Sequence, residues 1–169
     1  MTLDRLWAGW RSEYIDAVTA EDRPDGCLFC AVAAGDDDEG GVVAREALTF
    51  ALLNRYPYTS GHLMVAPRRH VSGLEALTAE EAAALMETTR RATVAVQAAY
   101  DPDGLNLGAN LGRAAGAGVP GHLHVHVLPR WVGDTNFMTS VAEARVLPEP
   151  LDRSLEKLRA AWPAEVRQR

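Results

Sequence analysis

Three of the five histidines in this chain alternate with aliphatic residues in the segment His122-Leu123-His124-Val125-His126. Alternation at every second residue is typical of a β-strand, because successive side chains of a strand point to opposite faces of the sheet. We therefore expect a strand over His122–Leu128 that carries three imidazole rings on one face, with Pro129 ending regular pairing. A neutral imidazole can attack phosphorus near neutral pH, since its ordinary pKa is about 6.5. The alternative for this strand is a metal site.

Two cysteines, Cys27 and Cys30, form a C-x-x-C pair. In a reducing compartment this spacing indicates a metal site or a redox pair rather than a structural disulfide. With His70 and one histidine of the alternating run, the cysteines would complete a tetrahedral Cys2His2 set. A site with four protein ligands is closed and therefore structural. We expect Zn²⁺ there, and two free reduced thiols are the alternative.

The run from Gly121 to Arg130, GHLHVHVLPR, resembles the signature of the histidine triad (HIT) family of nucleotidyl hydrolases and transferases. A second block, Leu52–Pro57 followed by Gly61–Pro67, looks like the nucleoside-binding strand pair of that family. The resemblance implies cleavage of a nucleoside 5′-phosphoryl linkage through a nucleotidyl-histidine intermediate. It also implies an α+β fold and a homodimer that extends one sheet across two subunits.

A third stretch indicates which branch of the HIT family the chain resembles. Pro129-Arg130-Trp131 and the following Gly133-Asp134-Thr135-Asn136-Phe137 are similar to a branch that contains bacterial diadenosine tetraphosphate (Ap4A) phosphorylases and hydrolases. Many other relatives carry Gly-Gln-Ser/Thr-Val just before the triad, whereas this chain has the sequence GAGVPG over residues 116–121. The family resemblance therefore favours a diadenosine polyphosphate as substrate, with water or phosphate as the second nucleophile.

The resemblance assigns a role to each histidine. The middle one, His124, would be the nucleophile, and His126 would contact phosphate or bridging oxygens. His62 would be the family's fourth histidine, hydrogen-bonded behind the triad, because one ring nitrogen must be held as a donor for the other to present its lone pair. His122 completes the triad, and in zinc-containing relatives the first triad histidine is also a metal ligand beside Cys27, Cys30 and His70.

Substrate contacts are also carried over from the family. Asn54 would bind the ribose hydroxyls, with a turn-forming role as its alternative, and Asn110 would contact the phosphate. Backbone N–H groups of the loop between Asn110 and the triad could form a phosphate nest. The remaining expected substrate-binding residues are apolar base-pocket residues, which could equally be core, and loop glycines: Leu52, Met64, Gly116 and Gly118.

Composition limits the other possibilities. The 169 residues are 47% hydrophobic, which suits one globular core, and they carry a net charge of −6. No basic tract is present, so we expect a small-molecule nucleotide as partner rather than a nucleic acid. No stretch approaches the length of a membrane span, and we expect a cytoplasmic protein that needs no organic cofactor. The rival functions are nucleoside phosphoramidate hydrolysis, sugar-phosphate nucleotidyl transfer, and a regulatory module that binds nucleotides without catalysis.

The elements that must position these residues follow from local patterns. Thr78-x-x-Glu81 is a capping box that predicts a long helix from Thr78 to about Tyr100. Its inward stripe is Leu85, Thr89, Ala92 and Val96. We expect an antiparallel sheet of about five strands, one long helix and a C-terminal helix in a single domain over residues 1–169. Its N-terminal docking segment would be 1–26 and its C-terminal extension 138–169. The expected strands are 42–44, 48–53, 62–66, 105–111 and 122–128, and a short helix is expected over 27–34.

Overall fold

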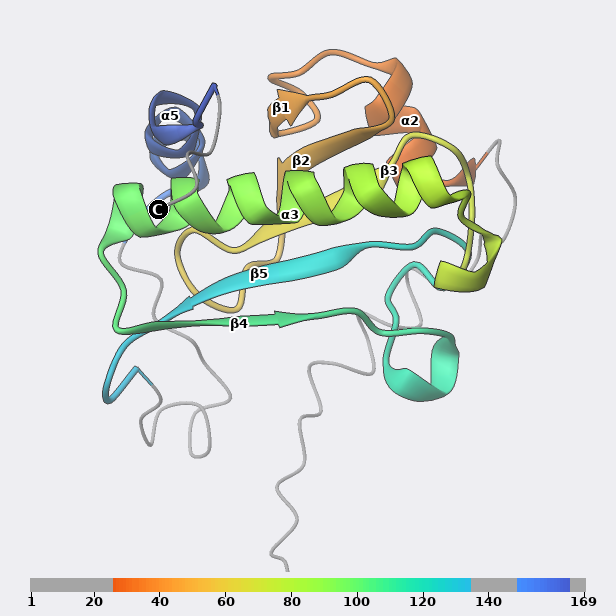
Figure 1. Cartoon of the computed structure of the whole chain (residues 1–169). Helices are drawn as coiled ribbons and strands as arrows, with labels where there is room; N and C mark the ends of the chain where they lie inside the picture. The colour runs from red at the N-terminus through yellow and green to blue at the C-terminus, as the bar shows by residue number, and fades with distance from the viewer. Residues whose placement is uncertain (1–25, 135–148, 165–169) are drawn as a thin grey trace, which may run out of the picture.

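The computed structural model describes residues 26–134 and 149–164. The expected N-terminal docking segment therefore lies outside the described residues, apart from residue 26, as does the first part of the C-terminal extension. Within the described ranges, the family-derived α+β fold is confirmed (Figure 1). No helix in these ranges has the length and apolar character that crossing a bilayer requires.

A five-stranded antiparallel sheet forms the centre of the fold, in the order β1-β2-β3-β5-β4. The first two strands form an antiparallel pair, and β3 pairs with β2 along its whole length, with Leu52 opposite Met64. The strand β4 lies at the edge, next to β5 (Figure 1). The strands are β1 (Val42–Arg45), β2 (Thr49–Leu53), β3 (Leu63–Pro67), β4 (Gly104–Gly108) and β5 (Val125–Arg130).

The long helix α3 (Ala79–Tyr100) begins where the capping box places it. The Thr78 hydroxyl accepts from the backbone N–H of Glu81, and the Glu81 carboxylate accepts from the N–H of Thr78. Arg69 also donates to this carboxylate, and these bonds lower the pKa of Glu81 to about 2. The four predicted inward residues of α3 are all buried. The other helices are α2 (Leu28–Ala34), α5 (Leu151–Ala161) and the short 3-10 turns η2 (Leu74–Ala76) and η3 (Arg113–Ala115).

Our prediction that the histidine strand begins at His122 is wrong, because β5 begins at Val125. Pairing with β3 runs from Leu63–Val127 to Val65–Val125, so two more residues in the same register would place Leu123 opposite Pro67. Proline has no backbone N–H to continue the ladder. Leu123 instead donates to the carbonyl of Val71 at 2.6 Å. His122 and His124 therefore lie on irregular backbone before the strand.

The expectation that Pro129 ends the pairing is also wrong, since β5 continues to Arg130 against β4. The strand tolerates this proline because β3 no longer flanks it: the β3 pairing stops at Val127. The Pro129 carbonyl accepts from the Thr59 hydroxyl. A strand residue points its nitrogen and its carbonyl to the same side, so the Pro129 nitrogen points away from β4 and no ladder hydrogen bond is lost.

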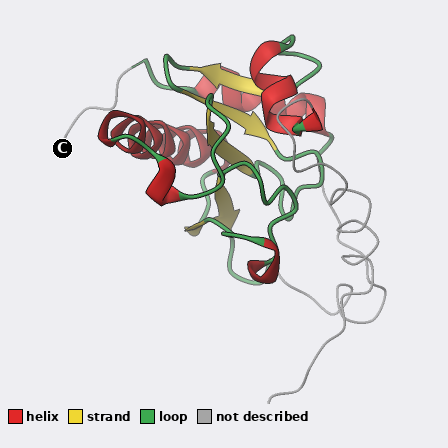
Figure 2. Cartoon of the chain, turned by 90° about the vertical axis from the view of Figure 1, so that its right-hand side faces the viewer, coloured by secondary structure: helices red, strands yellow, loops and turns green. Residues whose placement is uncertain are grey.

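The two faces of the sheet pack against different helices (Figure 2). On one face, α3 and α5 bury side chains such as Leu85, Val96 and Leu158 against the sheet. On the other face, α2 buries Phe29 against a cluster that contains Leu52 and Met64. Because both faces are covered, every residue of β2 and β3 is buried.

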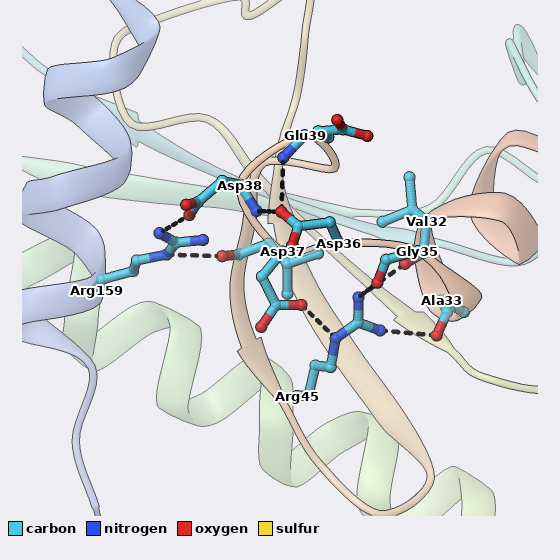
Figure 3. A network of polar contacts seen from close by, with 10 residues as sticks. Val32, Ala33, Gly35, Asp36, Asp37, Asp38, Glu39, Arg45 and Arg159 are labelled. Carbon is cyan, nitrogen blue, oxygen red and sulfur yellow. Dashed lines mark hydrogen bonds and ion pairs between the residues drawn. The ribbon is translucent and has the colours of Figure 1, made fainter.

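Arg45, at the end of β1, fixes the C-terminal end of α2 (Figure 3). Its guanidinium donates to the carbonyls of Val32, Ala33 and Gly35 at 2.8, 2.8 and 3.0 Å, and it also pairs with Asp37. The last carbonyls of a helix have no partner within the helix, so these bonds satisfy groups that would otherwise need water. The short α2 is thereby tied to the sheet.

Candidate functional site

The three histidines of the alternating run are buried and close together on the α2 side of the sheet. The ring centroids of His124 and His126 are 5.0 Å apart, with the rings nearly perpendicular. Rings of His122 and His124 both contact Phe29, at 5.2 and 4.8 Å between centroids. The expected grouping of the rings is therefore present, although only His126 is on the strand itself.

Hydrogen bonds fix the tautomer of His62 and, through it, that of His126. The backbone N–H of Tyr58 donates to Nδ1 of His62 at 3.2 Å. Since a backbone N–H can only donate, neutral His62 carries its proton on Nε2. This nitrogen is 2.9 Å from Nδ1 of His126, which must accept. Nε2 of His126 is then an N–H donor.

His124 has the opposite arrangement. Its Nδ1 lies 2.8 Å from the backbone carbonyl of His122, and a carbonyl can only accept. Nδ1 therefore carries the proton, and the lone pair is on Nε2. Burial lowers the pKa of His124 below its ordinary value, which keeps the ring neutral. A neutral imidazole with a fixed lone pair is the form that can attack an electrophile.

His122 faces the cysteines. Nε2 of His122 donates to the carbonyl of Pro67 at 2.9 Å, so the lone pair is on Nδ1. Nδ1 of His122 lies 3.3 Å from Sγ of Cys27 and 3.7 Å from Sγ of Cys30. The Sγ atom of Cys30 is in turn 3.3 Å from Nδ1 of His70. Burial lowers the pKa of His122 to about 4, which favours its neutral form.

The donor set Cys27, Cys30, His70 and His122 fits a tetrahedral zinc ion. All four ligand atoms lie within 4.8 Å of one another. Bonds of about 2.0–2.3 Å to Zn²⁺ give tetrahedral edges of about 3.3–3.8 Å, the range of the three distances above. The Pro67 carbonyl also holds the Nε2 proton of His122, a common arrangement for metal-binding histidines. The residues that the sequence nominated for a metal are thus brought together.

The expected substrate-binding residues lie in two places. Leu52 and Met64 are buried neighbours in the cluster around Phe29. The side chain of Asn54 accepts from the backbone N–H of Tyr56 at 2.9 Å, which is the turn-forming role given above as its alternative. This bond occupies Oδ1 and is compatible with a further contact through the amide nitrogen.

The loop before the triad is closed by its own hydrogen bonds. The Asn110 amide donates to the carbonyl of Gly116 at 3.4 Å, and the N–H of Gly116 donates to the carbonyl of Arg113. Gly116 has a φ of +85°, a conformation that glycine adopts without strain. The Gly116 amide is therefore already hydrogen-bonded within this turn. For Gly118, the other glycine expected to bind phosphate, that role stays a prediction.

Our sequence analysis missed two residues of this site, Tyr58, which donates to His62, and Phe29. Phe29 lies between the two cysteines, is 1% exposed, and stacks on the ring of His124 with 29° between the planes. Its position inside the C-x-x-C pair is the one available signal. Cysteines beside the histidine run bring the two residues between them near it, and of these Leu28 is exposed whereas Phe29 contacts the histidines.

Known proteins are similar to this chain over most of its length. A family model described as HIT domain matches residues 37–132. AP-4-A phosphorylase of Mycobacterium tuberculosis is 42% identical over 165 residues, which cover 95% of this chain and 85% of that protein. Protein hit of Bacillus subtilis is 32% identical over 107 residues, or 63% of this chain and 72% of the relative.

Solved structures share the architecture. A Zn-bound histidine triad family protein from Mycobacterium smegmatis is similar with a TM-score of 0.66 and 28% identity, over 83% of this chain and 95% of that one. A hypothetical histidine triad nucleotide-binding protein, ST2152 from Sulfolobus tokodaii, gives a TM-score of 0.65 and 29% identity, over 80% and 91%.

Proposed function

The chain belongs to the histidine triad (HIT) family, and from this premise we propose that it is an enzyme that cleaves Ap4A through a nucleotidylated His124. The observation that carries the proposal is the fixed Nε2 lone pair of a neutral, buried His124, beside the N–H donor of His126. The 42% identity to a protein named AP-4-A phosphorylase, over 95% of this chain, supports the substrate class.

In the first step, the Nε2 lone pair of His124 forms a bond to the phosphorus next to one adenosine. The P–O bond to the rest of the substrate breaks, and its electron pair leaves with ATP. The proton of His124 stays on Nδ1, and its hydrogen bond to the carbonyl of His122 keeps the ring aligned during the attack. In the second step, water or inorganic phosphate takes the adenylyl group and restores the imidazole.

His126 would hydrogen-bond a phosphate oxygen through Nε2, with His62 holding its tautomer from behind. This donor stabilises the negative charge that develops on the departing oxygen. The polyphosphate leaving group of Ap4A departs as a stable anion, whereas the amine of a phosphoramidate must be protonated before it can depart. The absence of Gln and Ser/Thr from the loop before the triad therefore favours a polyphosphate over a phosphoramidate.

We also propose that Asn54 binds the ribose, Leu52 and Met64 line the base pocket, and Asn110 with the Gly118 amide faces the phosphates. The apolar pair is next to Phe29 and the triad histidines, where a nucleoside joined to His124 would have to lie. Asn54 precedes the turn that leads to His62, and its N–H donates to the carbonyl of His62. The ribose and phosphate roles rest on the family resemblance.

Phosphate should decide the second step. We expect Ap4A with inorganic phosphate to yield ADP and ATP, because phosphate captures the adenylyl group, and little turnover without phosphate. Chromatography of the nucleotides measures the products formed with and without phosphate.

AMP and ATP in equal amounts, with or without phosphate, would instead identify a hydrolase. Turnover of an adenosine phosphoramidate or a nucleoside diphosphate sugar in place of Ap4A would favour the rival enzymes. Nucleotide binding without any turnover would favour a regulatory module.

We propose a structural zinc ion at Cys27, Cys30, His70 and His122. When bound, it would join the start of α2 to His70 and to the first triad histidine, and it would activate no water because all four positions are protein ligands. Burial and the neighbouring Cys27 raise the pKa of Cys30 to about 11 without a metal, and a bound cation would favour the thiolate. The donor set and the zinc-bound relative support this assignment.

We further propose a homodimer formed through β4. This strand lies at the sheet edge, and its Leu107 is 54% exposed. An edge strand with exposed apolar residues can extend a sheet into a second copy. Leu107→Lys is expected to halve the mass measured by light scattering, whereas Met86→Lys, at an exposed site on α3, should leave it unchanged. Equal masses for both variants would contradict a β4 interface.

A further inference from the structure

The ring of Phe29 forms one wall of the site around His124. The two rings are stacked, with 4.8 Å between centroids, and the face of Phe29 also meets His122 at 5.2 Å. The ring of Phe50 is also near, with 6.4 Å between its centroid and that of Phe29. Because the phenyl ring is stacked on the His124 ring, it restricts rotation of the imidazole out of its plane.

Three features hold Phe29 in this position. It is 1% exposed, and burying a phenyl side chain contributes roughly 1.5–3 kcal/mol to folding. The cysteines on either side of it are next to the first triad histidine. Its helix, α2, is tied to β1 by Arg45 (Figure 3). The ring is thus fixed from both ends of α2.

We propose that Phe29 is a positioning residue for His124, which sets the plane of the imidazole and stabilises the positive charge that the ring gains when it is nucleotidylated. This inference rests on the proposed function. The bond from Nε2 to phosphorus leaves Nδ1 protonated against the His122 carbonyl, so the imidazole becomes a cation in a buried site. No carboxylate is among the described ring and hydrogen-bond partners of His124. The π face of Phe29 lies within the roughly 6 Å at which an aromatic ring attracts a cation.

Fluorination of Phe29 separates charge from packing. Each added fluorine withdraws electron density from the ring face and weakens its attraction for a cation while the ring keeps nearly the same shape. We expect 4-fluoro-, 3,5-difluoro- and 3,4,5-trifluorophenylalanine at position 29 to slow adenylylation progressively, to a total of roughly 3- to 30-fold. Rapid-quench measurement of the enzyme-bound adenylyl group gives the rate. Equal rates across the series would overturn the electrostatic part of the proposal.

A second experiment tests positioning without any substrate. Long-range proton–nitrogen NMR of histidine-labelled protein reports the tautomer of His124, whose signals are identified by their loss in His124→Ala. We expect the wild type to show Nδ1–H alone and ring protons shifted upfield by Phe29. In Phe29→Leu, the upfield shift should disappear and the second tautomer should become visible. An unchanged His124 spectrum would overturn the positioning role.

Phe50→Leu is the matched control. It removes a buried ring from the same cluster, so its effect on stability is similar, but within the described part of the chain no ring contact joins Phe50 to His124. We expect the His124 signals and the adenylylation rate of this variant to remain near those of the wild type. An equal change in both variants would show a general packing effect and contradict a specific role for Phe29. Failure of the proposed function would abolish adenylylation in every variant, whereas the spectra would still report on positioning.

Discussion

Replacing His124 with alanine is expected to lower the turnover of Ap4A by at least about 10³-fold. The substitution removes the lone pair that forms the bond to phosphorus, and an enzyme that loses its nucleophile usually retains little more than the benefit of substrate binding. The neighbouring N–H of His126 can hydrogen-bond a phosphate but has no lone pair to offer at that nitrogen. Steady-state assays with phosphate measure the loss.

The control for this prediction is that the variant remains folded and binds nucleotide. Far-UV circular dichroism and calorimetric titration with a non-hydrolysable Ap4A analogue test both. Mass spectrometry of acid-free samples should also detect an adenylyl group on the wild-type enzyme and none on His124→Ala. Turnover within tenfold of the wild type in a folded variant would exclude His124 as the nucleophile.

Loss of the metal is expected to lower the thermal midpoint by roughly 5–15 °C. A ligand present at 100 to 1,000 times its dissociation constant stabilises a protein by about 3–4 kcal/mol, and a domain of this size shifts by about 2–4 °C per kcal/mol. The proposed ion joins segments 40 and more residues apart in the chain, so its removal loosens both α2 and the triad backbone. Calorimetry before and after treatment with a chelator measures the shift.

Cys30→Ser makes this prediction specific. We expect one zinc per wild-type chain by atomic emission and much less in the variant, because serine replaces a strong thiolate ligand. The variant should melt near the chelated wild type and respond little to added zinc. A wild-type protein that is free of zinc after growth in zinc-containing medium, and that melts at the same temperature with and without a chelator, would favour two reduced thiols instead.

The sequence alone determined the local elements and the candidate chemistry. Thr78 and Glu81 define the start of α3 because a capping box is satisfied within four residues, and the stripe from Leu85 to Val96 follows from the helical repeat. Alternation in the histidine run was enough to predict rings on one side of the backbone. The C-x-x-C pair and the family resemblance together suggested four metal ligands, and the structure brings all four residues close together.

The tertiary structure decided what depends on segments far apart in the chain. The histidine strand starts at Val125 because Pro67, on another strand, has no N–H to pair with Leu123. The pattern within residues 122–128 carries no trace of that proline. For the same reason, the stacking of Phe29 on His124 could not be derived locally, since about a hundred residues of chain separate the two rings.

The protonation pattern of the triad is the clearest example of a property that the tertiary structure decides. Residue type gives each histidine two possible tautomers, and the residue pattern of the run His122–His126 does not show which of them forms. The choice is made by carbonyl and N–H groups that the fold brings to each ring, from Tyr58 through His62 to His126 and from the His122 backbone to His124. Sequence thus supplied the imidazoles, and backbone geometry decided which nitrogen presents a lone pair, because a hydrogen bond depends on position as well as on chemical type.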